Sequence, residues 1–248
     1  MQTRGDGISS VEPAPHMHRR VTSFRSRRSS LTDAQQRTWA RLWPQLGADA
    51  GHRPLDTENW FGRSAPVVLE IGCGTGVSTA TMAQDEPGLD VVAVEVYRRG
   101  LAQLLGAIDR EGITNIRLVR GDGLDVLEHM VAPQSLTGVR VFFPDPWPKA
   151  RHHKRRLLQP PTVELIADRL VDGGVLHVAT DHADYAEQIA AVADAEPRLR
   201  RTTPEASLPI SVRRPTTKYE SKARDAGSPV AELLWEKQST RTRGGQRA

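Results

Sequence analysis

The chain has 248 residues, of which 38% are hydrophobic and 26% charged, with a net charge of +4 and one cysteine, Cys73. This length and composition favour one folded α/β domain with short extensions, and a single cysteine excludes an internal disulfide. No apolar run reaches the roughly 18 residues of a membrane span, and no signal-peptide core follows the first arginines, so we expect a cytoplasmic protein without a membrane partner.

Residues 1–30 are rich in Arg, Ser, Pro and His and lack apolar periodicity, which predicts a flexible basic arm. Thr32 and Gln35 have the spacing of a capping box at the start of a helix. Apolar side chains then recur at helical spacing, at Trp39, Leu42, Trp43 and Leu46. We expect these tryptophans to pack in the core rather than to stack on bases.

From residue 67 onward, apolar β-branched runs alternate with helical patterns. We predict strands at 67–71, 90–96, 116–120, 138–143 and 175–180. We predict helices near 78–84, 99–110, 124–130, 161–170 and 183–195. Weaker β segments follow near 199 and at 230–235. This alternation predicts an α/β, Rossmann-like fold: a mostly parallel sheet with helices on both faces, an antiparallel C-terminal strand, one domain over 31–237 and a loose basic tail over 238–248.

The segment LEIGCGTG ends the first of these strands in Glu70 and turns through Gly72, Gly74 and Gly76. A dinucleotide-binding turn would have glycine at position 77, so Val77 disfavours a nicotinamide dehydrogenase. The spacing after an acidic residue instead resembles the fingerprint of S-adenosylmethionine methyltransferases. That cofactor has no phosphate for the helix to hold, but it carries cationic groups that a carboxylate can stabilise.

Acidic residues also follow the next three strands. Glu95 could accept two hydrogen bonds from a ribose diol, Asp122 could accept from an adenine amino group, and Asp145 follows the fourth strand. Each acid alone has an alternative interpretation, as a loop carboxylate that is solvated or caps the next helix. Because the carboxyl ends of parallel strands form one crevice, we expect the four acids to line a single site.

The run FFPDPWPKARHHKRR, residues 142–156, combines a rigid acidic turn with dense positive charge. Prolines on both sides restrict Asp145, while Trp147 could either stack on a base or pack under the next loop. The cations are expected to contact RNA phosphates, although a solvated basic surface is the alternative; they are Lys149, Arg151, Lys154, Arg155 and Arg156. His152 and His153 have no cysteine nearby, so we expect no metal site.

This run closely resembles the signature of bacterial tRNA (guanine-N7)-methyltransferases. Further matches to that family are VTSFRSRRSSLTDAQQ, VAVEV, HVATDHADYAE and RRPTTKYE, so the resemblance spans roughly residues 20–235. It implies a class I methyltransferase fold, S-adenosylmethionine as cofactor, tRNA as partner, and 7-methylguanine at position 46 of the variable loop as product. Whether the protein is a monomer or a homodimer stays open.

The resemblance also implies residue roles. Asp145 takes the catalytic position, and cofactor roles fall on Glu70, Glu95 and Asp122 together with the glycine turn. The implied substrate contacts are Lys149, Asp181, Thr217, Lys218, Tyr219 and Glu220. The arm contributes three further candidates for RNA contact, Arg25, Arg27 and Arg28.

The chemistry of guanine fits a site built from acids. Guanine N7 carries a lone pair and no proton, so methyl transfer to it needs positioning and no general base. Two alternatives remain: an S-adenosylmethionine enzyme that acts on an exocyclic amine, and a non-catalytic RNA-binding protein with the same fold.

Overall fold

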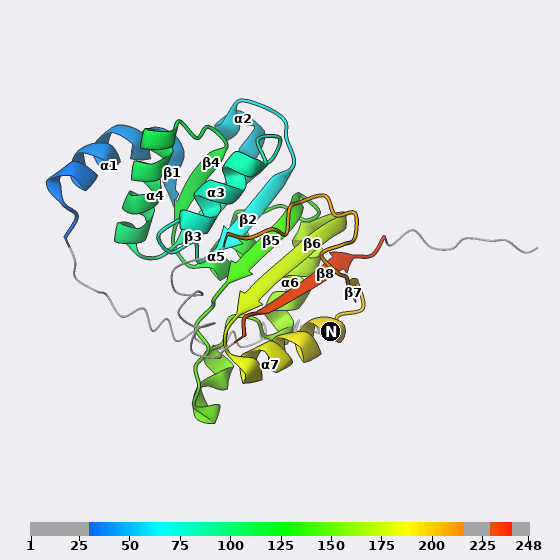
Figure 1. Cartoon of the computed structure of the whole chain (residues 1–248). Coiled ribbons are helices and arrows are strands. Elements are labelled where there is room, and N and C mark those ends of the chain that lie inside the picture. Colours follow the sequence, from blue (N-terminus) through cyan, green and yellow to red (C-terminus); the bar gives the residue numbers. More distant parts are fainter. Residues whose placement is uncertain (1–29, 216–228, 240–248) are drawn as a thin grey trace, which may run out of the picture.

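The computed structural model describes residues 30–215 and 229–239, so nearly all of the predicted arm and tail lies outside it (Figure 1). Eight strands form one sheet in the order β1-β4-β3-β2-β5-β6-β8-β7. The strands are β1 (Gly47–Asp49), β2 (Val67–Ile71), β3 (Asp90–Glu95), β4 (Ile116–Arg120), β5 (Leu136–Phe142), β6 (Leu170–Thr180), β7 (Leu199–Arg201) and β8 (Ala231–Lys237). The helices are α1 (Asp33–Leu46), α2 (Thr57–Phe61), α3 (Val77–Asp85), α4 (Arg98–Glu111), α5 (Gly123–His129), α6 (Pro160–Arg169) and α7 (Ala183–Asp194), with a 3₁₀ helix η1 (Ala150–Arg155).

The six strands from β1 to β6 pair in parallel, and β8 pairs antiparallel with both β6 and β7. The predicted Rossmann-like architecture is therefore confirmed: a mostly parallel sheet with antiparallel C-terminal strands. The predicted strands 67–71 and 116–120 have the bounds of β2 and β4, and the other predicted strands and helices differ from the structure at their ends only, apart from β6. That strand begins five residues earlier than expected, because Leu170 already pairs with Leu136 of β5, ahead of Gly173, where φ is +78°.

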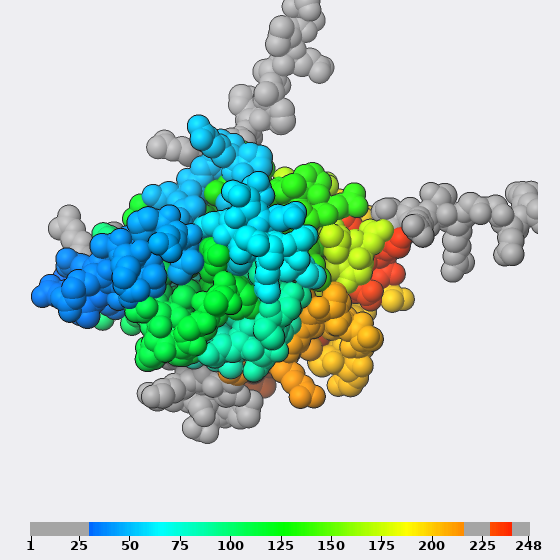
Figure 2. All heavy atoms as spheres, turned by 90° about the horizontal axis from the view of Figure 1, so that it is seen from above, coloured from blue at the N-terminus to red at the C-terminus, as the bar shows by residue number. Residues whose placement is uncertain are grey.

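Helices cover both faces of the sheet, as predicted (Figure 1). On one face, residues of α5, α6 and α7 pack with the odd positions of β2, such as Leu69. On the other face, α1, α3 and α4 pack on β3 and β4, and Ile210 packs beside Val68 of β2. Figure 2 shows the segment around residue 210, in orange, beside the teal atoms of α3. Both faces of the central strands are therefore buried, which explains their nearly continuous apolar sequences.

Helix α1 begins with the predicted capping box, in which Thr32 and Gln35 exchange side chain to backbone hydrogen bonds. Trp39 and Trp43 stack with ring centroids 4.0 Å apart, and the Arg98 guanidinium lies 4.6 Å above the Trp39 ring. Trp39 is buried, so the prediction that these tryptophans pack in the core is confirmed.

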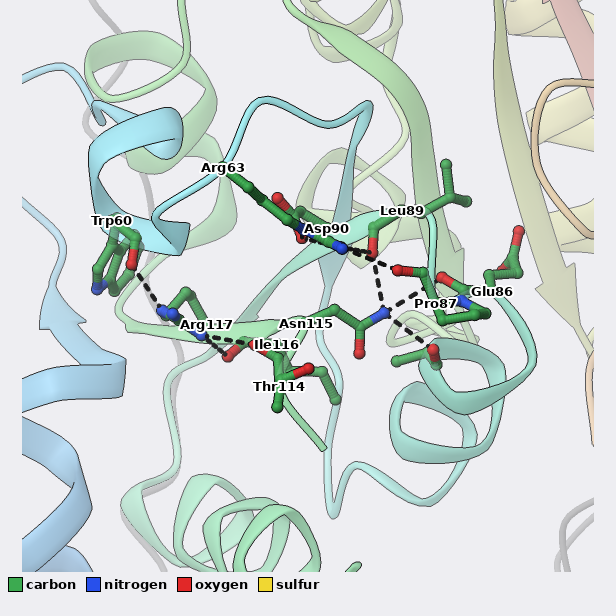
Figure 3. A network of polar contacts seen from close by, with 11 residues as sticks. Trp60, Arg63, Glu86, Pro87, Leu89, Asp90, Thr114, Asn115, Ile116 and Arg117 are labelled. Carbon is green, nitrogen blue, oxygen red and sulfur yellow. Dashed lines mark hydrogen bonds and ion pairs between the residues drawn. The ribbon is translucent and has the colours of Figure 1, made fainter. Parts of the chain in front are cut away.

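A buried polar network lies at the amino ends of β3 and β4, opposite the strand ends where Glu95 and Asp122 are found (Figure 3). Asn115 Nδ2 donates to the carbonyls of Ala83, Glu86 and Leu89 at 2.9, 3.2 and 2.9 Å. These bonds fix the loop between α3 and β3. Asp90, at the start of β3, is 1% exposed and accepts from both Nε and Nη2 of Arg63 at 2.9 and 2.6 Å.

Three short elements did not follow from the sequence: β1, α2 and η1. Each is three to six residues long, which is too short for a periodic pattern to show. Among the described residues, no helix is long and apolar enough to cross a membrane.

Candidate active site

Five acids lie at the carboxyl ends of five neighbouring parallel strands. In the spatial order β4-β3-β2-β5-β6 they are Asp122, Glu95, Glu70, Asp145 and Asp181. Glu70 and Glu95 are in the last residues of their strands, whereas the other three follow a strand end within three residues. One edge of the sheet therefore carries a row of carboxylates, at the place where open α/β sheets bind ligands.

The glycine turn between β2 and α3 leaves room beside this row. Gly72 and Gly74 have φ of +79° and +58°, a region that glycine enters without strain. A Cβ built on either would have no atom within 4 Å outside the adjacent residues, so the backbone faces open space. Gly76 differs, because a Cβ there would lie 2.6 Å from Leu104. The first two glycines thus open a cradle, and the third lets α3 pack against α4.

Glu95 connects this turn to the loop after β3. Its Oε2 accepts from Gly74 N and its Oε1 from Tyr97 N, both at 2.9 Å. Burial raises the pKa of Glu95, backbone hydrogen bonds from Tyr97, Gly74 and Val96 lower it, and the negative charge of Asp145 adds to the rise. Each carboxylate oxygen has a second lone pair, so Glu95 can still accept from a bound diol.

Glu70 is 2% exposed and lies in register with Arg140 of β5. Burial raises the pKa of Glu70, and the Arg140 guanidinium opposes that rise. Among the described residues, no donor reaches Glu70 Oε2. Arg140 itself is fully buried and pairs with Glu86 at 2.5 Å. A buried carboxylate oxygen without a partner beside an open cradle is suited to a cationic ligand group.

Asp122 is the N-cap of α5, where its Oδ1 accepts from Leu124 N at 2.9 Å. The helix-capping alternative is therefore realised. It is compatible with a ligand role because a carboxylate has further acceptor positions.

The turn that carries Asp145 has unusual backbone geometry on both sides. Phe143 and Trp147 have φ of +51° and +43°, a region that residues other than glycine rarely adopt. Asp145 lies exposed between them. The Trp147 ring meets the His152 ring edge-on at 5.8 Å, and the Arg155 guanidinium lies 5.1 Å from its centroid. The ring thus has packing partners within its own segment, which favours the packing interpretation of Trp147.

The cationic run forms η1 and its flanks. Lys149, Arg151 and Lys154 are exposed, and Arg155 is half-buried over Trp147. Arg156 was predicted to contact RNA, but its side chain is 1% exposed and has protein partners. Its Nε donates to the Pro146 carbonyl at 2.8 Å, and Asp184 and Gln188 bind the other nitrogens.

Asp181 directly follows β6 and is exposed at the same edge. The remaining predicted contacts lie outside the described residues: Arg25, Arg27 and Arg28 of the arm, and Thr217, Lys218, Tyr219 and Glu220.

One group of side chains on α5 could hold a metal ion by its geometry. The ligand atoms of Asp125, Glu128 and His129 lie within 4.8 Å of one another. Exposed acidic groups of this kind are common without an ion.

The sequence did not indicate a buried polar cluster beneath the Asp145 turn. His177 Nε2 and Glu232 Oε1 lie 2.6 Å apart, and Arg214 Nε lies 3.7 Å from the same oxygen. The Arg214 guanidinium lies 5.4 and 5.0 Å from the rings of Phe142 and Phe143. Two polar residues within apolar strands, Arg140 in GVRVFF and His177 in LHVAT, were the available signal.

Comparison with known proteins identifies the family. The family model described as "Putative methyltransferase" matches residues 64–233. The tRNA (guanine-N(7)-)-methyltransferase of Mycolicibacterium vanbaalenii is 71% identical over 239 residues, 91% of this chain and 90% of that protein. The enzyme of the same name from Mycobacterium leprae is 63% identical over 227 residues, 90% of this chain and 99% of that protein. Among solved structures, the 16S rRNA methyltransferase KamB aligns with a TM-score of 0.49 at 17% identity, over 75% of this chain and 95% of that one. The chain therefore belongs to the family of tRNA (guanine-N7)-methyltransferases.

Proposed function

We propose that this protein transfers the methyl group of S-adenosylmethionine to N7 of guanine 46 in the variable loop of tRNA. The observation that carries the proposal is the row of five acids at the strand ends, together with a glycine turn whose backbone faces open space at Gly72 and Gly74. Family membership supports methylation of guanine N7 in tRNA, since the relatives at 63–71% identity are named for that reaction.

The residues at the glycine turn fit the cofactor. Gly72 and Gly74 leave the space that a Cβ would fill, and Glu70 Oε2 offers a buried acceptor without a partner among the described residues. When bound, S-adenosylmethionine supplies a methyl group activated by a cationic sulfonium. In this proposal Glu95 accepts from the ribose hydroxyls, Asp122 accepts from the adenine amino group, and Glu70 stabilises the cationic end of the cofactor.

Asp145 orients the base and does not remove a proton. Guanine N7 has an in-plane lone pair and carries no proton, so the enzyme needs no general base at that atom. A carboxylate accepts well from guanine N1–H and the exocyclic amine, while adenine offers it much less. Its fixed negative charge also stabilises the positive charge that develops on the guanine ring. Asp181 is the second acceptor, and Lys149 anchors a phosphate or base oxygen.

The cations of η1 and its flanks hold the tRNA backbone: the exposed Lys149, Arg151 and Lys154, and the half-buried Arg155. If these four meet phosphates, log K falls with log salt at a slope of about −3 to −4. The arginines of the arm and residues 217–220 complete the proposed tRNA contacts.

The test is an Asp145→Asn enzyme compared with wild type on unmodified tRNA. An amide keeps the size of the side chain but removes its charge and one acceptor, so we expect turnover to fall about a hundredfold and guanine selectivity to weaken. Near-normal turnover with intact selectivity would contradict the role of Asp145. Calorimetry of S-adenosylmethionine binding to the variant is the control that its cofactor site is intact.

A further inference from the structure

Arg156 is the last residue of a cationic run, yet it has the surroundings of a structural residue. It is 2% exposed, whereas Arg151, five residues earlier, is exposed. Since a buried guanidinium is costly unless its donors are satisfied, its partners indicate its role.

Each of the three nitrogens of this guanidinium has a hydrogen-bond partner in the protein. Nε donates to the Pro146 carbonyl at 2.8 Å, Nη1 donates to Gln188 Oε1 at 2.5 Å, and Nη2 pairs with Asp184. The flat face lies 4.8 Å from the ring centroid of Tyr185. Asp184, Tyr185 and Gln188 are all residues of α7, so Arg156 ties the Pro146 carbonyl to that helix.

The bond to Pro146 bears directly on the catalytic turn. Pro146 follows Asp145, and the turn has positive φ at Phe143 and Trp147. Such strained backbone persists only where its surroundings over-determine it. Tyr185 adds a second contact between α7 and this segment, two residues after Arg156: its hydroxyl accepts a hydrogen bond from Leu158 N at 3.1 Å. The turn is therefore fastened to α7 immediately after the catalytic carboxylate.

We propose that Arg156 is a positioning residue, which holds Asp145 in place through the Pro146 carbonyl and makes no contact with tRNA. The inference rests on the proposed function for its effect on turnover. Its structural part, the fastening of the turn, does not depend on that function. Arginine fits this place because its planar fork directs donors from three separate nitrogens toward three acceptors, whereas the three donors of a lysine ammonium all lie on one nitrogen.

The test compares Arg156→Gln, Arg156→Lys and Arg151→Gln with wild type. Affinity for unmodified tRNA is measured across a salt series, because each lost phosphate contact makes the log–log slope shallower by about 0.7–0.9. We expect Arg151→Gln to show that change and Arg156→Gln to keep the wild-type slope. At saturating tRNA and cofactor we expect kcat to fall at least tenfold in both Arg156 variants.

Hydrogen exchange of the peptide that spans residues 142–149 gives a readout independent of catalysis. We expect faster exchange there in both Arg156 variants, and unchanged exchange in Arg110→Lys, an exposed α4 residue outside the site. A shallower slope for Arg156→Gln, or unchanged exchange together with unchanged kcat, would overturn the inference. If Arg156→Gln does not fold, Gln188→Met removes one partner of the guanidinium and should raise exchange in the same peptide, whereas wild-type exchange would overturn the inference. A wild-type enzyme that makes no 7-methylguanosine contradicts the proposed function instead, while slope and exchange still decide the role of Arg156.

Discussion

The carboxylate of Glu95 accepts a hydrogen bond from the backbone N–H of Gly74 at 2.9 Å. This bond joins the end of β3 to the glycine turn after β2. Because the other oxygen of Glu95 holds Tyr97 N, one side chain fixes two loops that border the crevice. Glu95 thus has two roles in the proposed cofactor site: it holds two loops in place, and it offers acceptors to the ribose hydroxyls.

Replacing Glu95 by Gln should weaken cofactor binding. The substitution replaces one carboxylate oxygen of residue 95 by an NH2 group. That donor would then face the backbone N–H of Gly74 or Tyr97. Hydrogen bonds to a charged group contribute about 1.5–3 kcal/mol, so we expect S-adenosylmethionine to bind about ten- to a hundredfold more weakly. Calorimetry measures this, with Glu111→Gln on α4 as the control for loss of one carboxylate. A dissociation constant within twofold of wild type would rule out this role for Glu95.

Two glycines of α4 should respond to alanine in opposite directions. A Cβ at Gly100 would lie 2.1 Å from the Gly74 carbonyl oxygen, whereas a Cβ at Gly106 would meet nothing within 4 Å. We expect Gly100→Ala to lower the unfolding free energy by about 1–3 kcal/mol and to weaken cofactor binding. Gly106→Ala should raise it by about 0.5–1 kcal/mol, because alanine favours a helix. Thermal unfolding distinguishes them, and equal shifts would contradict the close approach of α4 to the turn.

His177 should make stability depend on pH. Burial lowers its pKa, the positive charges of Arg140 and Arg214 lower it further, and Glu232 opposes the shift. The unfolded histidine takes up a proton near pH 6.5, while the folded one does so only at lower pH. Protons therefore favour the unfolded state, and the stability due to neutral His177 is lost as pH falls below about 6.5.

The measurement for His177 is the unfolding free energy from pH 8 to pH 5 for wild type and His177→Gln. We expect the wild-type value to fall more steeply than that of the variant below about pH 6.5. Parallel curves would show that His177 does not titrate differently in the two states.

Asn115→Asp should be strongly destabilising. In the wild-type protein, three carbonyl oxygens accept hydrogen bonds from Asn115 Nδ2, and the substitution places a carboxylate oxygen against them instead (Figure 3). An unpaired buried charge costs about 3–5 kcal/mol. Thr114→Asp puts the same charge on an exposed neighbour, where the change should stay within about 0.5 kcal/mol. Denaturant unfolding compares the two variants, and similar values would contradict the buried network.

The longer strands, four of the five acids in the row and the glycine turn could be predicted from the sequence because their causes are local. Apolar runs end in Glu70, Glu95 and Asp145, and parallel strands bring their carboxyl ends together. The role of Arg156 could not be predicted, because its burial depends on Asp184 and Gln188, 28 and 32 residues later in the chain.

The pairing of His177 with Glu232 is equally non-local, since it follows from the antiparallel register of β6 and β8. In the cationic run of residues 149–156, the sequence shows which residues are positively charged. Tertiary contacts determine that Arg151 is exposed and Arg156 is buried. Short elements such as β1 also depend on their neighbours, since its three residues are held by the parallel pairing with β4.

The most direct test of the central claim is incubation of the wild-type protein with unmodified tRNA and methyl-labelled S-adenosylmethionine, followed by nucleoside mapping. We predict label in 7-methylguanosine, with strand cleavage at position 46 after borohydride and aniline treatment. Label in a base methylated on an exocyclic amine, or no transfer by protein that binds the cofactor, would contradict the account.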